Sequence, residues 1–98
     1  MKARSLLDRR IVLTPKAFAE LVLWEVPVPL VGSVHVYKYR MTLVAKGVCV
    51  LRYDNEAGKG DHVHRGAEEF PYHFQGIDRL VADFETDVRR WLDEHGDS

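Results

Sequence analysis

One helical pattern stands at the end of this chain, and it limits the possible folds more than any other feature of the sequence. Apolar side chains recur there at intervals of three and four residues, which is the spacing of one face of a helix. The helix predicted over residues 77–94 carries the stripe Ile77, Leu80, Val81, Phe84, Val88, Trp91 and Leu92. Gly76 and Asp78 suit its start, and Gly96 is a natural stop. A single helix with one apolar stripe has to cover a second layer, which the preceding residues must supply.

The residues before the helix have the composition and alternation of β-strands. Residues 34–45 give the clearest pattern, and Lys46-Gly47 favours a hairpin turn into a return strand over residues 48–55. Residues 18–26 predict another strand, which ends at Pro27 and Pro29 because proline cannot donate to a ladder. Residues 3–13 indicate one irregular strand or two short ones, and residues 70–74 a short edge strand.

This order of elements, strands first and one helix last, predicts the fold class. We expect a single domain over residues 1–98 of the α+β class. Its antiparallel sheet has four to five strands, with one long C-terminal helix packed on one face. The small core of such a domain could gain stability from a partner or from a homodimer contact.

The register of the central hairpin decides which side chains share a face. A two-residue turn pairs Leu43 with Val50, Met41 with Arg52 and Tyr39 with Asp54. In that register the opposite face of the hairpin carries Lys38, Arg40, Thr42, Leu51 and Tyr53. An error of one residue in the turn would reverse the faces of the return strand.

Composition excludes several classes of protein. The 98 residues are 46% hydrophobic and 30% charged, which fits a folded globular chain rather than a disordered one. No apolar run approaches the roughly 18 residues of a membrane span, and Asp8 interrupts the apolar stretch that a secretory signal needs. The single Cys49 cannot form an internal disulfide, and we expect it to be a buried, inert thiol. A cytoplasmic protein with no membrane segment is the expectation.

Catalytic residue types concentrate between positions 52 and 66, and we interpret residues 56–69 as a polar, glycine-containing loop. Cleavage of RNA by its own 2′-hydroxyl needs a base, an acid and cations that stabilise the developing charge. His62 and His64 are the predicted acid–base pair, because imidazole titrates near neutral pH. Asp54 or Asp61 would orient one imidazole. The predicted phosphate contacts are Arg52, Lys59 and Arg65. Replacing either histidine in such an exposed loop should leave the fold intact.

Two other interpretations of this segment remain open. His62 and His64 with Asp54 or Asp61 form a two-histidine, one-carboxylate set, to which His73 could add a ligand. No cysteine or long-range histidine spacing completes a metal motif, so we expect neither metal nor cofactor. Alternatively the segment is structural, with Asp54 and Asp61 capping the backbone of the loop.

A second segment, residues 35–40, suggests nucleic-acid contacts. Alternation places Lys38 and Arg40 on one face and Tyr37 and Tyr39 on the other. Lys38 and Arg40 could follow a phosphate backbone while Tyr53 stacks on a base. The alternative is a solvated outer face with the tyrosines in the core. Trp24 and Trp91 are interpreted as core or rim residues.

These segments together resemble the TumE toxin family. The matching stretches are residues 18–27, 35–40, 52–55, 58–64, 71–74 and 80–84, and Tyr53-Asp54-Asn55 followed by Gly58-Lys59-Gly60-Asp61-His62-Val63-His64 is the most specific. The resemblance implies a cytoplasmic, growth-inhibiting protein that is neutralised by a helix-turn-helix antitoxin. Metal-independent endoribonuclease action is our inference from the residues and from analogy with other small α+β toxins. The alternatives are a non-catalytic module that blocks a cellular target, and a metal-dependent phosphodiesterase.

Overall fold

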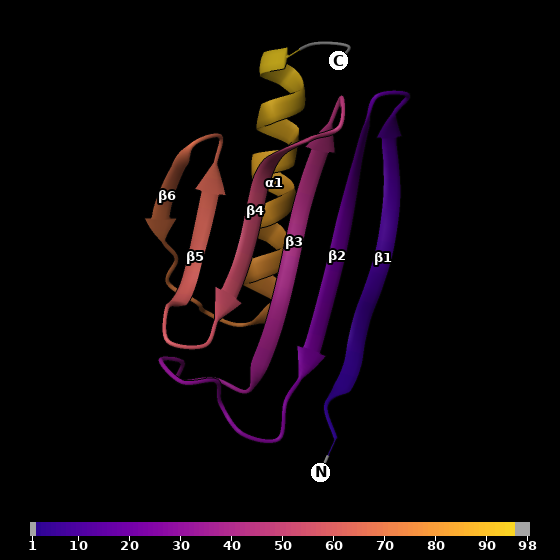
Figure 1. Cartoon of the computed structure of the whole chain (residues 1–98). Helices are drawn as coiled ribbons and strands as arrows, with labels where there is room; N and C mark the ends of the chain where they lie inside the picture. The colour runs from indigo at the N-terminus through magenta and orange to yellow at the C-terminus, as the bar shows by residue number, and fades with distance from the viewer. Residues whose placement is uncertain (1, 96–98) are drawn as a thin grey trace.

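Six antiparallel strands and one helix make up the computed structural model, which describes residues 2–95 (Figure 1). Each strand pairs with the next along the chain, so the sheet has the order β1-β2-β3-β4-β5-β6. The elements are β1 (Arg4–Thr14), β2 (Ala17–Glu25), β3 (Tyr37–Ala45), β4 (Val48–Glu56), β5 (Gly60–Arg65), β6 (Glu68–Pro71) and α1 (Ile77–His95). The α+β class, the antiparallel sheet and the C-terminal helix are as predicted. The sheet has six strands rather than four or five.

The additional strand, β5, comes from the segment that was interpreted from the sequence as a loop. Residues 56–69 complete β4, turn, and then form β5 and the start of β6. Gly58 and Gly60 adopt φ angles of 85° and 76°, so these glycines build a tight turn rather than a long loop. Val63 is only 3% exposed and faces the core, whereas its neighbours on either side face away from it. The two histidines therefore lie on a strand.

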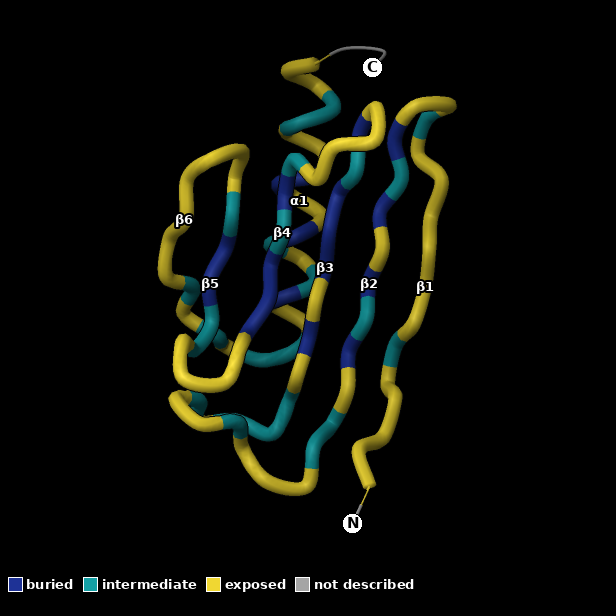
Figure 2. The backbone as a smooth tube through the Cα atoms, in the orientation of Figure 1, coloured by how far each residue is buried: buried dark blue, intermediate teal, exposed yellow. Residues whose placement is uncertain are grey.

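The helix covers one face of the sheet and leaves the other without a covering layer. The apolar stripe of α1 packs on the side chains of β2 to β5, and buried positions alternate with more exposed ones along β2 and β3 (Figure 2). The core consists of Ala17, Ala19, Leu21, Leu23, Tyr39, Met41, Leu43, Ala45, Leu51, Tyr53, Val63, Leu80, Phe84 and Val88. We call the covered side of the sheet the helix face and the opposite side the open face. Within residues 2–95 no helix is long and apolar enough to span a membrane.

A β-bulge in the central hairpin corrects the predicted register. Lys46 and Gly47 form the two-residue turn, but Leu43 pairs with Leu51 because Val50 is passed over between Leu51 and Cys49. Every pair below the bulge is therefore shifted by one residue from the prediction. The extra residue sends Leu51 and Tyr53 to the helix face, where they are buried.

The shifted register has its main consequence on the open face. Arg40 pairs with Asp54, and Thr42 pairs with Arg52. Directly paired residues of antiparallel strands point to the same side of the sheet, so Arg52 and Asp54 join Lys38 and Arg40 there. The prediction that Arg52 and Asp54 share a face with Met41 and Tyr39 is wrong.

Three further predictions, for Cys49, for Tyr39 and for the two tryptophans, meet different outcomes. Cys49 is exposed and not buried, because its pairing with Val44 places it on the open face. Tyr39 lies in the core with 2% exposure, as the alternation of residues 35–40 allowed. Trp24 is 38% exposed at the surface, whereas Trp91 packs against the core.

Candidate functional site

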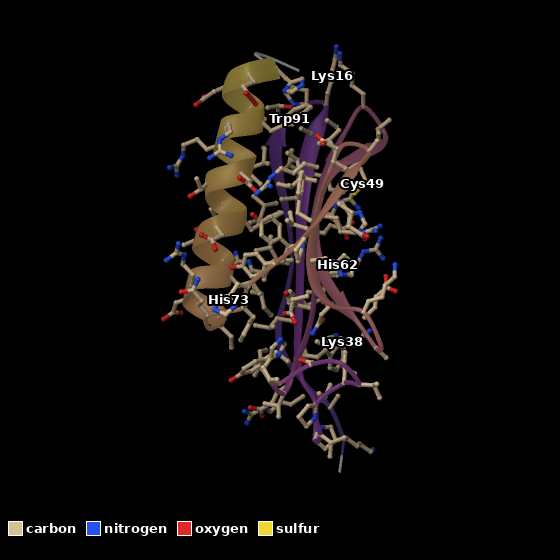
Figure 3. All side chains as sticks on the ribbon, turned by 90° about the vertical axis from the view of Figure 1, so that its left-hand side faces the viewer. Lys16, Lys38, Cys49, His62, His73 and Trp91 are labelled. Carbon is tan, nitrogen blue, oxygen red and sulfur yellow. The ribbon has the colours of Figure 1, made fainter. Side chains whose placement is uncertain are left out.

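Five polar side chains from three neighbouring strands meet on the open face. Arg52 and Asp54 come from β4, His62 and His64 from β5, and Glu69 from β6. The pairs Asp54–His62, Arg52–His64 and His64–Glu69 stand directly opposite one another in the sheet. Such partners have Cβ atoms about 5 Å apart, so their side chains touch. We call these five residues the open-face cluster. Figure 3 shows His62 on the side of the sheet away from the helix.

The cluster is connected by short polar contacts. Asp54 Oδ1 lies 2.8 Å from His62 Nε2, and Asp54 Oδ2 lies 3.2 Å from Arg52 Nε. The Nε2 atom of His64 lies 3.0 Å from Arg52 Nη2 and 2.9 Å from Glu69 Oε2. The two imidazole rings stand nearly perpendicular, with centroids 4.9 Å apart. The contacts thus run without interruption from β4 to β6.

Burial divides the cluster into a buried floor, formed by Asp54 and His62, and a more exposed rim, formed by His64 and Glu69. His62 and Asp54 are only 5% and 7% exposed, while the side chains of His64 and Glu69 are 24% and 46% exposed. Three buried atoms, Arg52 Nε, Asp54 Oδ1 and His62 Nε2, make no well-aligned hydrogen bond. Asp54 Oδ1 and His62 Nε2 are nevertheless 2.8 Å apart, and Arg52 Nε lies 3.2 Å from the other carboxylate oxygen, Oδ2. The floor is therefore held by close contacts of Asp54 with His62 and Arg52 rather than by well-aligned hydrogen bonds.

The two histidines present their ring nitrogens differently. His62 Nδ1 lies 3.2 Å from the carbonyl oxygen of Gly60, which can only accept, so this nitrogen carries a hydrogen. Its Nε2 faces the carboxylate of Asp54. Neither nitrogen of His62 is open to a substrate. His64 uses Nε2 within the cluster, and its Nδ1 contacts no other polar group of residues 2–95.

Basic side chains extend the open face beyond the cluster. Lys38 and Arg40 are exposed, and neither forms an ion pair with another of residues 2–95. Both line a pocket of about 380 Å³ that also contains Asp54 and ends at Trp24. A second pocket, of about 250 Å³, shares Arg40 and continues along β2 and β3 to Cys49. These two pockets form a shallow groove, the open-face groove, that begins at the buried floor of the cluster.

Asp61 belongs to a different group of residues, on the helix face. Its Oδ2 accepts hydrogen bonds from the Tyr39 hydroxyl at 2.6 Å and lies 2.8 Å from His35 Nε2. Burial, and then the hydrogen bond to Asp61, raise the pKa of the Tyr39 hydroxyl far above its usual value. The His35 ring stacks on Phe74 with centroids 3.9 Å apart. Asp61 therefore cannot orient His62 or His64.

Tyr53 and Arg65 lie on the helix face and not in the open-face cluster. Tyr53 is 2% exposed, and its hydroxyl donates to Asp87 of α1, so it cannot stack on a base. Arg65 Nη2 lies 2.7 Å from Asp87 Oδ2 and fastens β5 to the helix. Lys59 is exposed in the turn between β4 and β5, beyond the pairing of Glu56 with Gly60 and without a contact to the cluster.

Two residues of the site were missed by the sequence analysis. Glu69 reaches His64 from β6, and no sequence signal marked it because β6 was not predicted to begin before residue 70. Trp24 offers an exposed indole at the far end of the groove. Its signal was present, since alternation over residues 18–26 places it on the same side as Val22.

The structure reduces the set of possible metal ligands that the sequence suggested, which were Asp54, Asp61, His62, His64 and His73. Asp54, His62 and His64 each offer one ligand atom, and these atoms lie within 4.8 Å of one another. Asp61 is not among them, because it lies on the other face of the sheet. His73 is also excluded, since it lies on the helix side in Figure 3.

Three comparisons with known proteins bear on the family of this chain. No curated protein and no solved structure matches it significantly. The family model described as Toxin TumE matches residues 2–92, nearly the whole chain. That span includes all six strands and most of α1, and therefore the complete open-face cluster. The chain belongs to the TumE toxin family.

Proposed function

We propose that this toxin inhibits growth by cleaving RNA on the open face of its sheet. The observation that carries the proposal is the open-face groove, in which unpaired cations lead from an exposed tryptophan to a buried His–Asp floor. Single-stranded RNA is bound by proteins that combine cations for the phosphates with aromatic surfaces for the bases. The groove supplies both and ends at groups able to move a proton.

Each side chain of the groove has a role in this proposal. Lys38 and Arg40 hold the backbone, with Trp24 as the stacking surface in place of the buried Tyr53. Arg52 stabilises the charge that develops on the phosphate. His64 is the more exposed histidine, and its Nδ1 makes no contact with another polar group of residues 2–95, so it is the one that can exchange a proton directly with RNA. His62 holds Asp54 in place.

An antitoxin is the partner that membership of a toxin family implies. We propose that it is a helix-turn-helix protein and that an acidic segment of it covers Lys38 and Arg40. Two unpaired cations on an otherwise ordered sheet favour a polyanionic or acidic partner. Occupying the groove would keep RNA away from His64.

Mapping RNA ends in cells tests the proposal. The wild-type chain, His64→Ala and the control His73→Ala are each induced without the antitoxin, and cellular RNA ends are sequenced. We expect new ends with the wild type and His73→Ala, and none with His64→Ala. Growth arrest without new RNA ends would instead identify the chain as a non-catalytic module that blocks its target.

A further inference from the structure

We infer that the open-face cluster binds one divalent transition-metal ion through Asp54 Oδ1, His62 Nε2 and His64 Nε2, with Glu69 Oε2 as the fourth donor. Binding of the ion follows from the geometry alone. Its chemical role, as the cofactor of RNA cleavage, rests on the proposed function.

The four donor atoms already surround one region of space. The atoms of Asp54, His62 and His64 lie within 4.8 Å of one another. Glu69 Oε2 is 2.9 Å from His64 Nε2 and 3.7 Å from His62 Nε2. In a tetrahedral site with bonds of about 2.1 Å, donor atoms stand about 3.4 Å apart. The separations within the cluster, from 2.8 Å to at most 4.8 Å among the donors of Asp54, His62 and His64, bracket that value.

The orientation of the His62 ring provides a second geometric argument. Its Nδ1 lies 3.2 Å from the Gly60 carbonyl oxygen, so Nε2 is the nitrogen turned toward the cluster. That Nε2 lies 2.8 Å from Asp54 Oδ1, and both atoms are buried. The positive centre between these two atoms is either the proton of an imidazolium or a metal ion. Metal-binding histidines typically donate their other ring nitrogen to a backbone carbonyl in this way.

Arg52 explains how the cluster is held together without an ion. Its guanidinium contacts both Asp54 Oδ2 and His64 Nε2, so it supplies positive charge to the same donors. His64 Nε2 cannot both accept from Arg52 and donate to Glu69, although both lie within 3.0 Å. An ion would coordinate His64 and Glu69 together, and Arg52 would keep only its contact with Asp54.

The donor set selects the kind of ion. Two imidazoles with carboxylates suit Zn²⁺, Mn²⁺, Co²⁺ or Fe²⁺, whereas Mg²⁺ and Ca²⁺ prefer oxygen ligands alone. The side of the site that faces the groove stays open for water or a phosphate oxygen. The ion would then stand between the His–Asp floor and the cations that hold RNA.

The ion would take over proton abstraction from His64 in RNA cleavage. An ion held by Asp54, His62, His64 and Glu69 would supply a hydroxide that could accept the 2′-hydroxyl proton and become water, while the 2′-oxygen would form a bond to phosphorus. The bond from phosphorus to the 5′-oxygen breaks, and that oxygen takes a proton from a second water. The products are a 2′,3′-cyclic phosphate and a 5′-hydroxyl, with no net redox change.

Titration of the metal-free chain with Zn²⁺ by calorimetry, and with Co²⁺ by visible absorption, tests the inference. We expect one ion per chain, a four- or five-coordinate Co²⁺ spectrum, and a rise in Tm on binding. Asp54→Asn keeps the shape of the buried side chain, and His64→Ala alters a partly exposed one. Each should weaken binding at least about tenfold, whereas His73→Ala should leave it unchanged.

Two results would overturn the metal site. One is a folded wild-type chain that binds neither ion, and the other is His64→Ala or Asp54→Asn binding as tightly as the wild type. RNA cleavage that persists in chelator would also refute the cofactor role while leaving the proposed function intact. Stoichiometric binding without any RNA cleavage would refute the proposed function and leave the metal site standing.

Discussion

At the scale of the residue, two histidines that are two positions apart on β5 occupy different environments. Alternation along β5 places His62 and His64 on one face of the sheet. It could not predict that His62 is buried, because the strands on both sides of β5 and the reach of Glu69 from β6 enclose it. The tripeptide Tyr53-Asp54-Asn55 shows the same dependence on context. Tyr53 is bonded to α1, Asp54 lies at His62, and Asn55 donates to the Tyr37 carbonyl of β3 at 2.7 Å.

The two histidines should therefore respond differently to substitution. His64→Ala is predicted to abolish toxicity at a cost below about 1 kcal/mol, because its contacts are partly solvated. His62→Ala should also lower the free energy of unfolding by about 1–3 kcal/mol, because it leaves Asp54 buried without its neighbour. This replaces the expectation that neither change affects the fold. Urea denaturation of both variants measures the difference, and equal midpoints would contradict it.

At the scale of the element, the bulge at Val50 determines which side chains form the site. The turn at Lys46-Gly47 and both strands were predictable from alternation. The bulge was not predictable from alternation. Val50 and Leu51 are both apolar, so the local sequence does not decide which of them faces the core. The decision depends on β5 and α1, which bury Leu51 and Tyr53 and so turn Arg52 and Asp54 outward. The strand β5 was not predicted either, because the polar composition of residues 56–69 is typical of a loop.

Deleting Val50 tests this register. Cys49 and Leu51 already face opposite sides of the sheet, so their direct linkage restores a regular ladder without moving any downstream residue. We expect a folded protein that retains its toxicity. It should lose about 1–2 kcal/mol of stability with the partly buried valine side chain and the bond from Gly66 N to Val50 O. A deletion variant that fails to fold would support the unbulged register.

At the scale of the whole molecule, the sheet separates the polar groups that hold strands and helix together from the polar groups of the candidate site. Asp61 and Asp87 on the helix face hold tyrosines and fasten β5 and α1, whereas Lys38, Arg40 and the open-face cluster lie on the other side. Neighbours along the chain, such as Asp61 and His62, are thus parted by the thickness of the sheet. Sequence proximity suggested a single site, and strand alternation divides it in two.

Alkaline unfolding should follow from the helix-face tyrosines. Burial first, and then hydrogen bonds to Asp61, Asp87 and Asp83, raise the pKa of Tyr39, Tyr53 and Tyr72 well above the usual 10.0. The folded chain keeps these protons while the unfolded chain releases them, so stability is complete below about pH 10 and falls as the pH rises further. Tyrosinate absorbance and circular dichroism should change together. Full ionisation of all three residues in a folded chain would contradict the expectation.

The salt dependence of RNA binding should distinguish the groove cations Lys38 and Arg40 from Lys59, which lies outside the groove. Lys38→Ala and Arg40→Ala are each predicted to weaken binding of single-stranded RNA and to reduce the slope of log K against log salt by about 0.7. Lys59→Ala, in the turn outside the groove, serves as the matched control and should change neither value. Fluorescence anisotropy at several salt concentrations gives both quantities. Equal effects from Lys59 and Lys38 would mean that RNA does not follow the groove.

The most direct test of RNA cleavage on the open face is the initial rate at which the purified chain cuts a single-stranded RNA, with Zn²⁺ or Mn²⁺ supplied. His64→Ala should lower that rate about 10²–10⁴-fold while the chain stays folded, whether the histidine transfers the proton or holds the ion. His73→Ala, a histidine on the helix side, should keep the wild-type rate. Equal rates for the two variants, or no cleavage by a folded wild-type chain that still arrests growth, would contradict the account.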